Sequence, residues 1–166
     1  MKLSRYLSED AIKLEMETVI EPLPEGGSLR KWRDEAKRKV INELVGLLEN
    51  GARIGNRTKL LNDFVNREKK ATTGIGHGVA LPHIRSLQAK DLIVAFARST
   101  QGYDFESLDD KPTHLFFLMA APPYDDSLYL RVFKTLSQML QHEQFRQELM
   151  EVSSSGEVIR AKKAME

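Results

Sequence analysis

The sequence of 166 residues contains no cysteine, and this absence removes several kinds of chemistry at once. Without a thiol the chain cannot form disulfides, use a cysteine nucleophile, carry a phosphocysteine or bind a metal through thiolates. A protein that needs no disulfides suits a reducing compartment, so we expect a cytoplasmic location.

The sequence also lacks an excess of charge of either sign, because 24 Asp+Glu residues balance its 25 Lys+Arg residues. This balance gives no global reason to expect nucleic acid or an anionic membrane surface as a partner. Long hydrophobic runs are missing too, and no stretch approaches the roughly 18 apolar residues that span a bilayer. We therefore expect a soluble protein, with no nucleic acid partner and no direct membrane insertion.

The N-terminal part of the chain predicts a short irregular region followed by a long helix. Residues 8–10 are expected to form a helical turn and residues 12–16 a strand, whereas the prolines and glycines of residues 21–27 predict a loop. Ser28 is the expected cap of the long helix, whose apolar stripe ends at the stop signal Asn50-Gly51.

The middle of the chain predicts one more helix and then a set of strands. Asn56 or Thr58 is the expected cap of that helix, which ends near Arg67-Glu68. Three apolar runs have the length and composition of buried strands: residues 79–81, 92–97 and 115–120. Residues 103–105 are a candidate edge piece between the last two runs.

The C-terminal part again predicts helices. Asp125, Asp126 or Ser127 can cap a long helix over residues 128–140. Shorter helical segments are expected around residues 145–150 and 158–159. Helices on both sides of short buried strands indicate an α/β fold, in which one sheet is flanked by helices on both faces. The length of the chain favours a single domain over residues 1–166.

A basic run from Arg30 to Lys39 surrounds the single tryptophan, Trp32. Such a run at the start of a helix is most often a solvated face. The alternative is a docking face for an acidic partner or nucleic acid, in which case binding would weaken steeply with salt.

A small-residue segment between residues 71 and 85 carries most of the chemical information. Gly74, Gly76 and Gly78 allow positive φ angles and a close approach of backbone N–H groups to an anion. However, Val79 stands where a dinucleotide fingerprint needs its last glycine, and no Walker lysine follows. Nucleotide binding is therefore not supported.

The segment ends in His83, which directly follows a proline and a short apolar strand. A neutral imidazole can accept a phosphoryl group if cations and N–H donors surround the phosphoryl oxygens. The local candidates for that role are Arg67, Thr72, Thr73, Arg85 and the glycine amides. Two other interpretations stay open: a purely structural histidine, and a zinc site shared with His77, although the spacing fits no helical ligand pair.

The residues Arg67-Glu68 and the string Thr73-Gly74-Ile75-Gly76-His77-Gly78-Val79-Ala80-Leu81-Pro82-His83 carry a resemblance. They resemble the active-site segment of fructose/mannitol-type enzyme IIA domains of the phosphoenolpyruvate-dependent sugar phosphotransferase system, a family that includes nitrogen-regulatory members. The resemblance extends from Leu7 to Ile159, with an apparent insertion at about residues 22–37. It implies a mixed sheet flanked by helices.

The resemblance also implies a phosphocarrier. His83 would accept a phosphoryl group from HPr or an HPr-like phosphocarrier, and Arg67 would neutralise the phosphoryl charge. The phosphoryl-binding loop would comprise Thr73, Gly74, Gly76 and Gly78. The group would pass to an enzyme IIB partner, or its presence would regulate a target protein. No cofactor and no metal are expected.

One departure from the family pattern concerns the helix after the last strand. The family commonly has a second histidine facing the first, and here the matching dipeptide is Tyr129-Leu130. The Tyr129 hydroxyl can donate a hydrogen bond, Arg131 could supply positive charge, and His77 could offer a replacement imidazole. A regulatory binding module that serves no sugar is therefore the alternative function.

Overall fold

A mixed β-sheet forms the centre of the computed structural model, which describes residues 2–51, 53–124 and 126–166. Its strands in those residues are β1 (Ile12–Lys13), β2 (Gly74–Gly76), β3 (Val79–Ala80), β4 (His83–Arg85), β5 (Ile93–Tyr103) and β6 (Thr113–Ala121). The strand order is β1-β5-β6-β3-β2, and β4 pairs with β6 as well. Antiparallel pairing joins β5 to β6, whereas β3 and β4 run parallel to β6.

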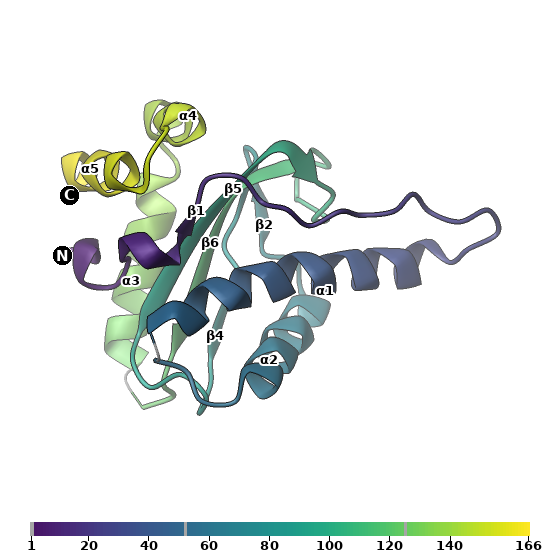
Figure 1. Ribbon diagram of the computed structural model, residues 1–166, viewed down its shortest axis with the longest axis horizontal. Helices are drawn as coiled ribbons and strands as arrows, with labels where there is room; N and C mark the ends of the chain where they lie inside the picture. The colour runs from purple at the N-terminus through teal and green to yellow at the C-terminus, as the bar shows by residue number, and fades with distance from the viewer. Residues whose placement is uncertain (1, 52, 125) are drawn as a thin grey trace.

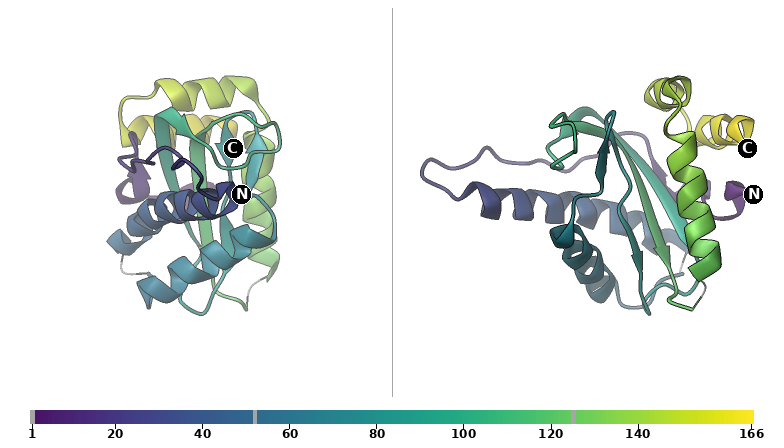
Figure 2. Two further views of the ribbon diagram at one scale, coloured as in Figure 1. Left: turned by 90° about the vertical axis from the view of Figure 1, so that its right-hand side faces the viewer. Right: turned by 180° about the vertical axis from the view of Figure 1, so that it is seen from behind.

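Helices cover both faces of this sheet (Figures 1 and 2). The α-helices in the described residues are α1 (Leu29–Leu48), α2 (Arg57–Lys70), α3 (Asp126–Met139), α4 (Glu143–Glu151) and α5 (Ser155–Met165). Helices α1 and α2 lie on one face, α3 crosses the other, and α4 and α5 gather beside one end of α3. The expected α/β fold, with one sheet between helical layers, is confirmed.

Two hydrophobic clusters, one on each face, hold these layers together. On β5, Phe96 belongs to the α3 side, whereas its neighbours Ala95 and Ala97 belong to the α1–α2 side. Successive residues of a strand point to opposite faces, so an uninterrupted apolar run serves both clusters. This is why the two long strands read as continuous hydrophobic stretches in the sequence.

Strands β3 and β4 are two parts of one line along β6. Val79 pairs with Leu115 and His83 pairs with Met119, so the register of the two parts is the same. The interruption falls at Leu81 and Pro82, where the Leu81 N–H donates to the Thr73 carbonyl and proline has no N–H to donate. The sequence predicts that His83 follows a short strand, and the structure adds that His83 itself begins a further strand, β4.

The helix starts follow the capping residues. The Ser28 side chain accepts a hydrogen bond from the Lys31 N–H, and the Asn56 side chain accepts one from the Lys59 N–H. Both observations confirm the expected caps, with Asn56 rather than Thr58 at the second helix. Helix α3 begins at Asp126, and the candidate cap Asp125 lies outside the described residues.

Several boundaries differ from the sequence prediction. The first strand is limited to Ile12–Lys13, and residues 103–105 form no separate edge piece because Tyr103 ends the long strand β5. The final helical turn is a full helix, α5. Among the described residues, no helix is long and apolar enough to cross a membrane.

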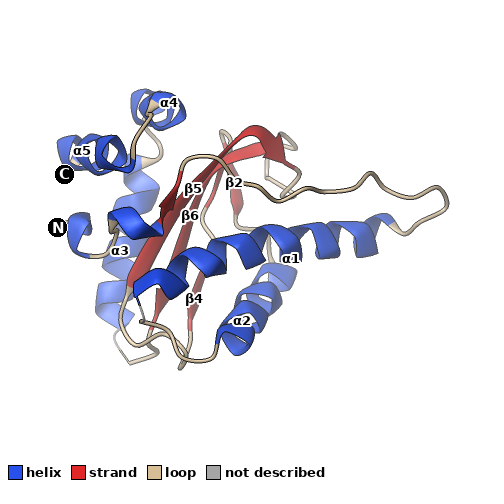
Figure 3. Cartoon of the chain, in the orientation of Figure 1, coloured by secondary structure: helices blue, strands red, loops and turns tan. Residues whose placement is uncertain are grey.

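An extended segment over residues 17–28 projects from the sheet and returns to it through the first turns of α1 (Figure 3). It contains no helix or strand among its residues, as its prolines and glycines predict. The Trp32 Nε1–H donates to the Glu21 carbonyl at 2.8 Å, which ties the segment to α1. The insertion at residues 22–37 stays a prediction, and these residues occupy the loop and the start of α1.

Candidate functional site

His83 opens β4 on the face of the sheet that α3 covers. Its ring centroid lies 4.5 Å from that of Phe133 and 6.2 Å from that of Tyr129, both on α3. The side chain is half-buried, so the ring is packed on one side and reachable on the other. Sequence reasoning missed Phe133, which resembles any apolar residue of an amphipathic helix.

One ring nitrogen of His83 is engaged with the backbone. Nδ1 lies 2.7 Å from the Leu81 carbonyl oxygen, and a carbonyl can only accept. Nδ1 therefore carries the hydrogen, and the lone pair of the neutral ring is on Nε2. Burial lowers the pKa of His83, an effect that the bond to Leu81 opposes and the nearby Arg67 charge reinforces. The ring is thus kept neutral, as a nucleophile requires.

Two guanidinium groups lie near this histidine. Arg67, in the last turn of α2, donates through Nη1 to the Ala71 carbonyl at 3.0 Å and remains half-buried. Arg85, two residues along β4, places its guanidinium carbon 5.2 Å from the centre of the Tyr129 ring. Arg85 also forms an ion pair with Asp126 at the start of α3. Two cations thus lie in this region, of which Arg85 has an acidic partner, and the Glu68 carboxylate also acts on His83.

Tyr129 faces this region in place of a second imidazole. Its side chain is buried, and burial raises the pKa of the phenol to about 12, against the opposing effects of Arg85 and Arg67. The hydroxyl therefore stays protonated at neutral pH and can act only as a neutral hydrogen-bonding group. It cannot replace a titratable histidine.

Two residues proposed to assist His83 do not lie beside it. Arg131 is exposed on α3. Residues two positions apart on an α-helix point in directions about 200° apart, so Arg131 faces away from Tyr129. His77 is exposed in the turn between β2 and β3. Val79 and His83 already differ by four positions along β6, which is about 13 Å of strand. A zinc site shared by His77 and His83 is therefore incompatible with the fold.

The glycine segment forms a β-hairpin rather than a cradle around His83. Gly76 and Gly78 adopt φ angles of +95° and +76°, which shape the turn between β2 and β3. The Gly74 N–H donates to the Thr72 hydroxyl, and the Thr73 N–H donates to the Glu68 carboxylate. The N–H groups of Thr73 and Gly74 are therefore already occupied, and a phosphoryl-binding role of this loop stays a prediction.

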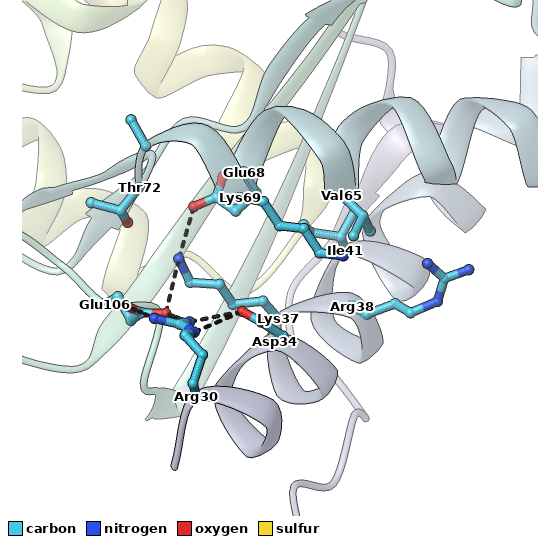
Figure 4. A pocket seen from close by; sticks show the side chains of 11 residues that line it. Arg30, Asp34, Lys37, Arg38, Ile41, Val65, Glu68, Lys69, Thr72 and Glu106 are labelled. Carbon is cyan, nitrogen blue, oxygen red and sulfur yellow. Dashed lines mark hydrogen bonds and ion pairs between the residues drawn. The ribbon is translucent and has the colours of Figure 1, made fainter. Parts of the chain in front are cut away.

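Glu68 is the buried carboxylate that fixes this part of the chain, and sequence reasoning gave it no role. It is 5% exposed and accepts hydrogen bonds from the Thr73 N–H at 2.9 Å and the Thr73 hydroxyl at 2.7 Å. It also accepts from Lys37 Nζ at 3.1 Å (Figure 4). Glu68 thereby joins α1, the end of α2 and the start of the hairpin, next to Arg67.

The basic run at the start of α1 faces acidic side chains of the same molecule. Arg30 pairs with Asp34 and Glu106, and Arg33 pairs with Asp104 at 3.2 Å. Hydrogen bonds from Arg30 lower the pKa of Glu106 to about 2. Arg30 and Arg33 thus have acidic partners within the molecule, and docking of an acidic partner or nucleic acid along this run stays a prediction.

The chain matches one family model over residues 32–163, described as "Phosphoenolpyruvate-dependent sugar phosphotransferase system, EIIA 2". It is 36% identical to the fructose-specific EIIA component of Haloferax volcanii, over 74% of this chain and 79% of that protein. It is 32% identical to the fructose-specific EIIABC component of Bacillus subtilis, where the match covers 96% of this chain but only 22% of that protein.

Solved structures show the same fold. The nitrogen regulatory protein IIA-Ntr from Neisseria meningitidis aligns with a TM-score of 0.81 and 28% identity, covering 96% of this chain and 98% of that one. The IIA mannitol protein of Escherichia coli aligns with a TM-score of 0.72 over 93% of this chain and 97% of that one, at 19% identity. The second likeness concerns the fold alone.

Proposed function

The chain belongs to the EIIA 2 family of the phosphoenolpyruvate-dependent sugar phosphotransferase system, and from this premise we propose that it is a phosphocarrier with His83 as its acceptor. A phosphohistidine on an HPr-like protein is the donor. The relationship to phosphotransferase components of known systems supports the reaction class. The position of the His83 ring supports the choice of residue.

The observation that carries the proposal is the contact between His83 Nδ1 and the Leu81 carbonyl at 2.7 Å. It leaves Nε2 with the lone pair, and the half-buried ring is accessible to a partner. The Nε2 lone pair attacks the phosphorus, a P–N bond forms, and the P–N bond to the donor histidine breaks with its electron pair returning to the donor nitrogen. No proton needs to leave Nε2 for this step.

Positive charge beside the acceptor is expected to stabilise the transferring group. Phosphoryl transfer spreads charge over three equatorial oxygens, and catalysis depends mainly on position and electrostatics. Arg67 is the guanidinium whose charge acts on His83 directly. Arg85 is held over the Tyr129 ring and by Asp126, and it is the second candidate cation. The Tyr129 phenol contributes packing and a neutral hydroxyl.

The test is phosphorylation of the purified chain by phosphoenolpyruvate, enzyme I and an HPr-like carrier, followed by intact-mass measurement. One acid-labile phosphoryl group is expected, and His83→Gln should abolish its addition. His142→Gln is the matched control, because His142 is exposed and far along the chain at the start of α4. Normal labelling of His83→Gln, or loss of labelling in His142→Gln, would refute the assignment.

A second variant tests the role of charge. Arg67→Gln should reduce the rate of phosphorylation by about a hundredfold, which is the usual cost of removing one group that stabilises transition-state charge. The final extent of labelling should be retained at long times. A rate equal to that of the unaltered chain would remove Arg67 from the proposal.

The destination of the phosphoryl group divides the proposal into two forms. The Escherichia coli IIA mannitol protein has been solved in complex with phosphorylated enzyme IIB, so transfer to such a partner is one form. Regulation of a target protein is the other, and the likeness to nitrogen regulatory protein IIA-Ntr over 96% of this chain favours it. If the His83→Gln variant still binds a target protein although no phosphoryl group is transferred, the regulatory form is favoured.

A further inference from the structure

Two backbone carbonyls hold the side chains that are proposed to act in phosphoryl transfer. The Leu81 carbonyl accepts from Nδ1 of His83 at 2.7 Å, and the Ala71 carbonyl accepts from Nη1 of Arg67 at 3.0 Å. Small errors in the placement of reacting groups are costly in rate, so both carbonyls must themselves be fixed. The orientation of the two side chains therefore depends on what holds Leu81 and Ala71 in place.

Leu81 is held by Thr73. Gly74 pairs with Ala80 across the hairpin, so Thr73 and Leu81 lie opposite each other one residue further along. The Leu81 N–H donates to the Thr73 carbonyl at 3.0 Å. Both residues are buried, so water does not compete for this hydrogen bond. A displacement of Thr73 would therefore move the residue whose carbonyl orients the His83 ring.

Thr73 is itself held by Glu68, in the last turn of α2. The Thr73 N–H donates to one oxygen of the carboxylate at 2.9 Å, and the Thr73 hydroxyl donates to the other at 2.7 Å. These two bonds close the turn that follows α2, and Ala71 lies within that turn. The same two bonds therefore also fix the carbonyl that holds Arg67.

The Glu68 carboxylate is fixed from a third side by α1. Lys37 Nζ lies 3.1 Å from it, and both side chains are buried (Figure 4). Glu68 and Thr73 are only 5% and 4% exposed, so a protein that docks on the surface does not touch them. Their influence on His83 consequently passes through Leu81, and their influence on Arg67 passes through Ala71.

From these contacts we infer that Glu68 and Thr73 are positioning residues, through which one buried carboxylate orients both the His83 ring and the Arg67 guanidinium. The inference rests on the proposed function of His83. Loss of the Thr73 hydroxyl removes one of the two bonds that close the turn. The Leu81 carbonyl is then less well placed, and the His83 ring populates the tautomer whose Nε2 carries a hydrogen and has no free lone pair.

The tautomer of His83 is a readout that a merely structural role would not move. Thr73→Val removes the hydroxyl and keeps a β-branched side chain. With the ring neutral, ¹⁵N NMR of the unaltered chain should give two well-separated imidazole shifts, with the hydrogen on Nδ1. In Thr73→Val the two shifts should approach each other, because both tautomers are populated. Thr73→Ser keeps the hydroxyl and should restore the separation.

Phosphorylation kinetics distinguish positioning from binding of the donor. At saturating phosphorylated HPr-like carrier, Thr73→Val should lower the rate constant about tenfold, which is the effect of one lost hydrogen bond. The KM for the carrier should stay within about twofold, because Thr73 is buried. Thr73→Ser should recover the rate to within about threefold of the unaltered chain.

Thr113→Val is the matched control. Thr113 is fully buried at the start of β6, and among the described residues its hydroxyl has no hydrogen-bond partner. The same atoms are thus removed from an equally buried position that holds no other residue in place. The rate constant and the His83 ring shifts should both remain as in the unaltered chain.

A measurement on the unaltered chain tests the inference even if Thr73→Val does not fold. A scalar coupling across the hydrogen bond is expected between the Leu81 amide ¹⁵N and the Thr73 carbonyl ¹³C. Its absence would show that Thr73 does not hold Leu81, and the inference would be overturned.

Two results with the variants would also overturn it. Slower phosphorylation of Thr73→Val with unchanged His83 ring shifts would assign the Thr73 hydroxyl to direct contact with the phosphoryl group. An equal loss of rate in Thr113→Val would reduce the effect to packing. If Thr73→Val is phosphorylated at the normal rate and His83→Gln is not phosphorylated, the positioning role fails and the proposed function stands. Normal labelling of His83→Gln defeats the proposed function itself.

Discussion

Replacement of Lys37 by methionine tests whether the buried ion pair between α1 and α2 stabilises the fold. Lys37 and Glu68 have side chains that are 8% and 4% exposed, and their charged atoms lie 3.1 Å apart. In the structure Lys37 Nζ lies 5.0 Å from the centre of the Phe105 ring. Lys37→Met keeps an unbranched side chain over that ring but leaves the buried Glu68 carboxylate without its cation. The variant should therefore be markedly less stable.

The magnitude follows from the partners that Glu68 keeps. Removal of one member of a buried pair costs about 3–5 kcal/mol. Two hydrogen bonds from Thr73 would still compensate the Glu68 carboxylate, so we expect the lower end, about 3 kcal/mol. For a chain of this length that loss corresponds to a fall in Tm of roughly 6–12 °C.

A second substitution shows that the loss comes from the unpaired charge. In the double variant Lys37→Met with Glu68→Gln, a neutral amide replaces the carboxylate and can still bond to the Thr73 N–H and hydroxyl. We expect it to recover to within about 1 kcal/mol of the unaltered chain. Urea unfolding followed by far-UV circular dichroism measures all three free energies of unfolding.

The control for this series is Lys39→Met, which removes an exposed charge two residues along the same helix. It should change the free energy of unfolding by no more than about 0.5 kcal/mol. The reasoning is refuted if Lys37→Met also stays within that range, or if the double variant is less stable than Lys37→Met.

Two further predictions concern His83 and the end of β5. Burial lowers the pKa of His83 below its usual value of about 6.5, so NMR titration should give a lower midpoint. The folded state then binds fewer protons than the unfolded state, and stability should fall as pH drops through about 6.5, less so in His83→Gln. Gly102→Ala should destabilise the chain by about 2 kcal/mol, measured by urea unfolding: φ is +82°, and an added Cβ would lie 2.7 Å from His114 Cε1. An unshifted His83 midpoint, or a fully stable Gly102→Ala, would contradict these expectations.

The order of helices and strands could be predicted largely from periodicity and caps. Ser28 and Asn56 marked their helix starts, and the two apolar runs marked β5 and β6. Strand β4 could not be found in this way, because Pro82 interrupts the line along β6 and leaves only three residues after it. Its pairing depends on β6, which is far along the chain.

The candidate site stays a prediction, although the structure shows where its residues lie. The sequence indicated His83 and Arg67, and the structure brings both near Tyr129. The position of Arg131 could have been judged from the helical period alone, since a residue two places from Tyr129 lies on the far side of the helix. The hairpin geometry of the glycines could not be predicted in this way. The local spacing of the glycines does not reveal how far the turn between β2 and β3 lies from His83.

The assignment of the loop glycines to phosphoryl binding stays a prediction without geometric support in this conformation. The N–H groups of Thr73 and Gly74 already donate to neighbouring side chains. The same region gains its rigidity from Glu68, a residue type that sequence reasoning places on the surface. The burial of Glu68 beside Arg67 is recognisable only once the helices have been placed.

The attachment of Trp32 to Glu21 has a practical consequence for spectroscopy. The chain has one tryptophan, and that indole sits where the extended segment meets α1, away from both hydrophobic clusters. Its fluorescence consequently reports detachment of the segment, whereas circular dichroism reports loss of the helices. If the fluorescence transition precedes the transition followed by circular dichroism, Trp32 is an intrinsic fluorescent probe for any partner that binds the projecting segment.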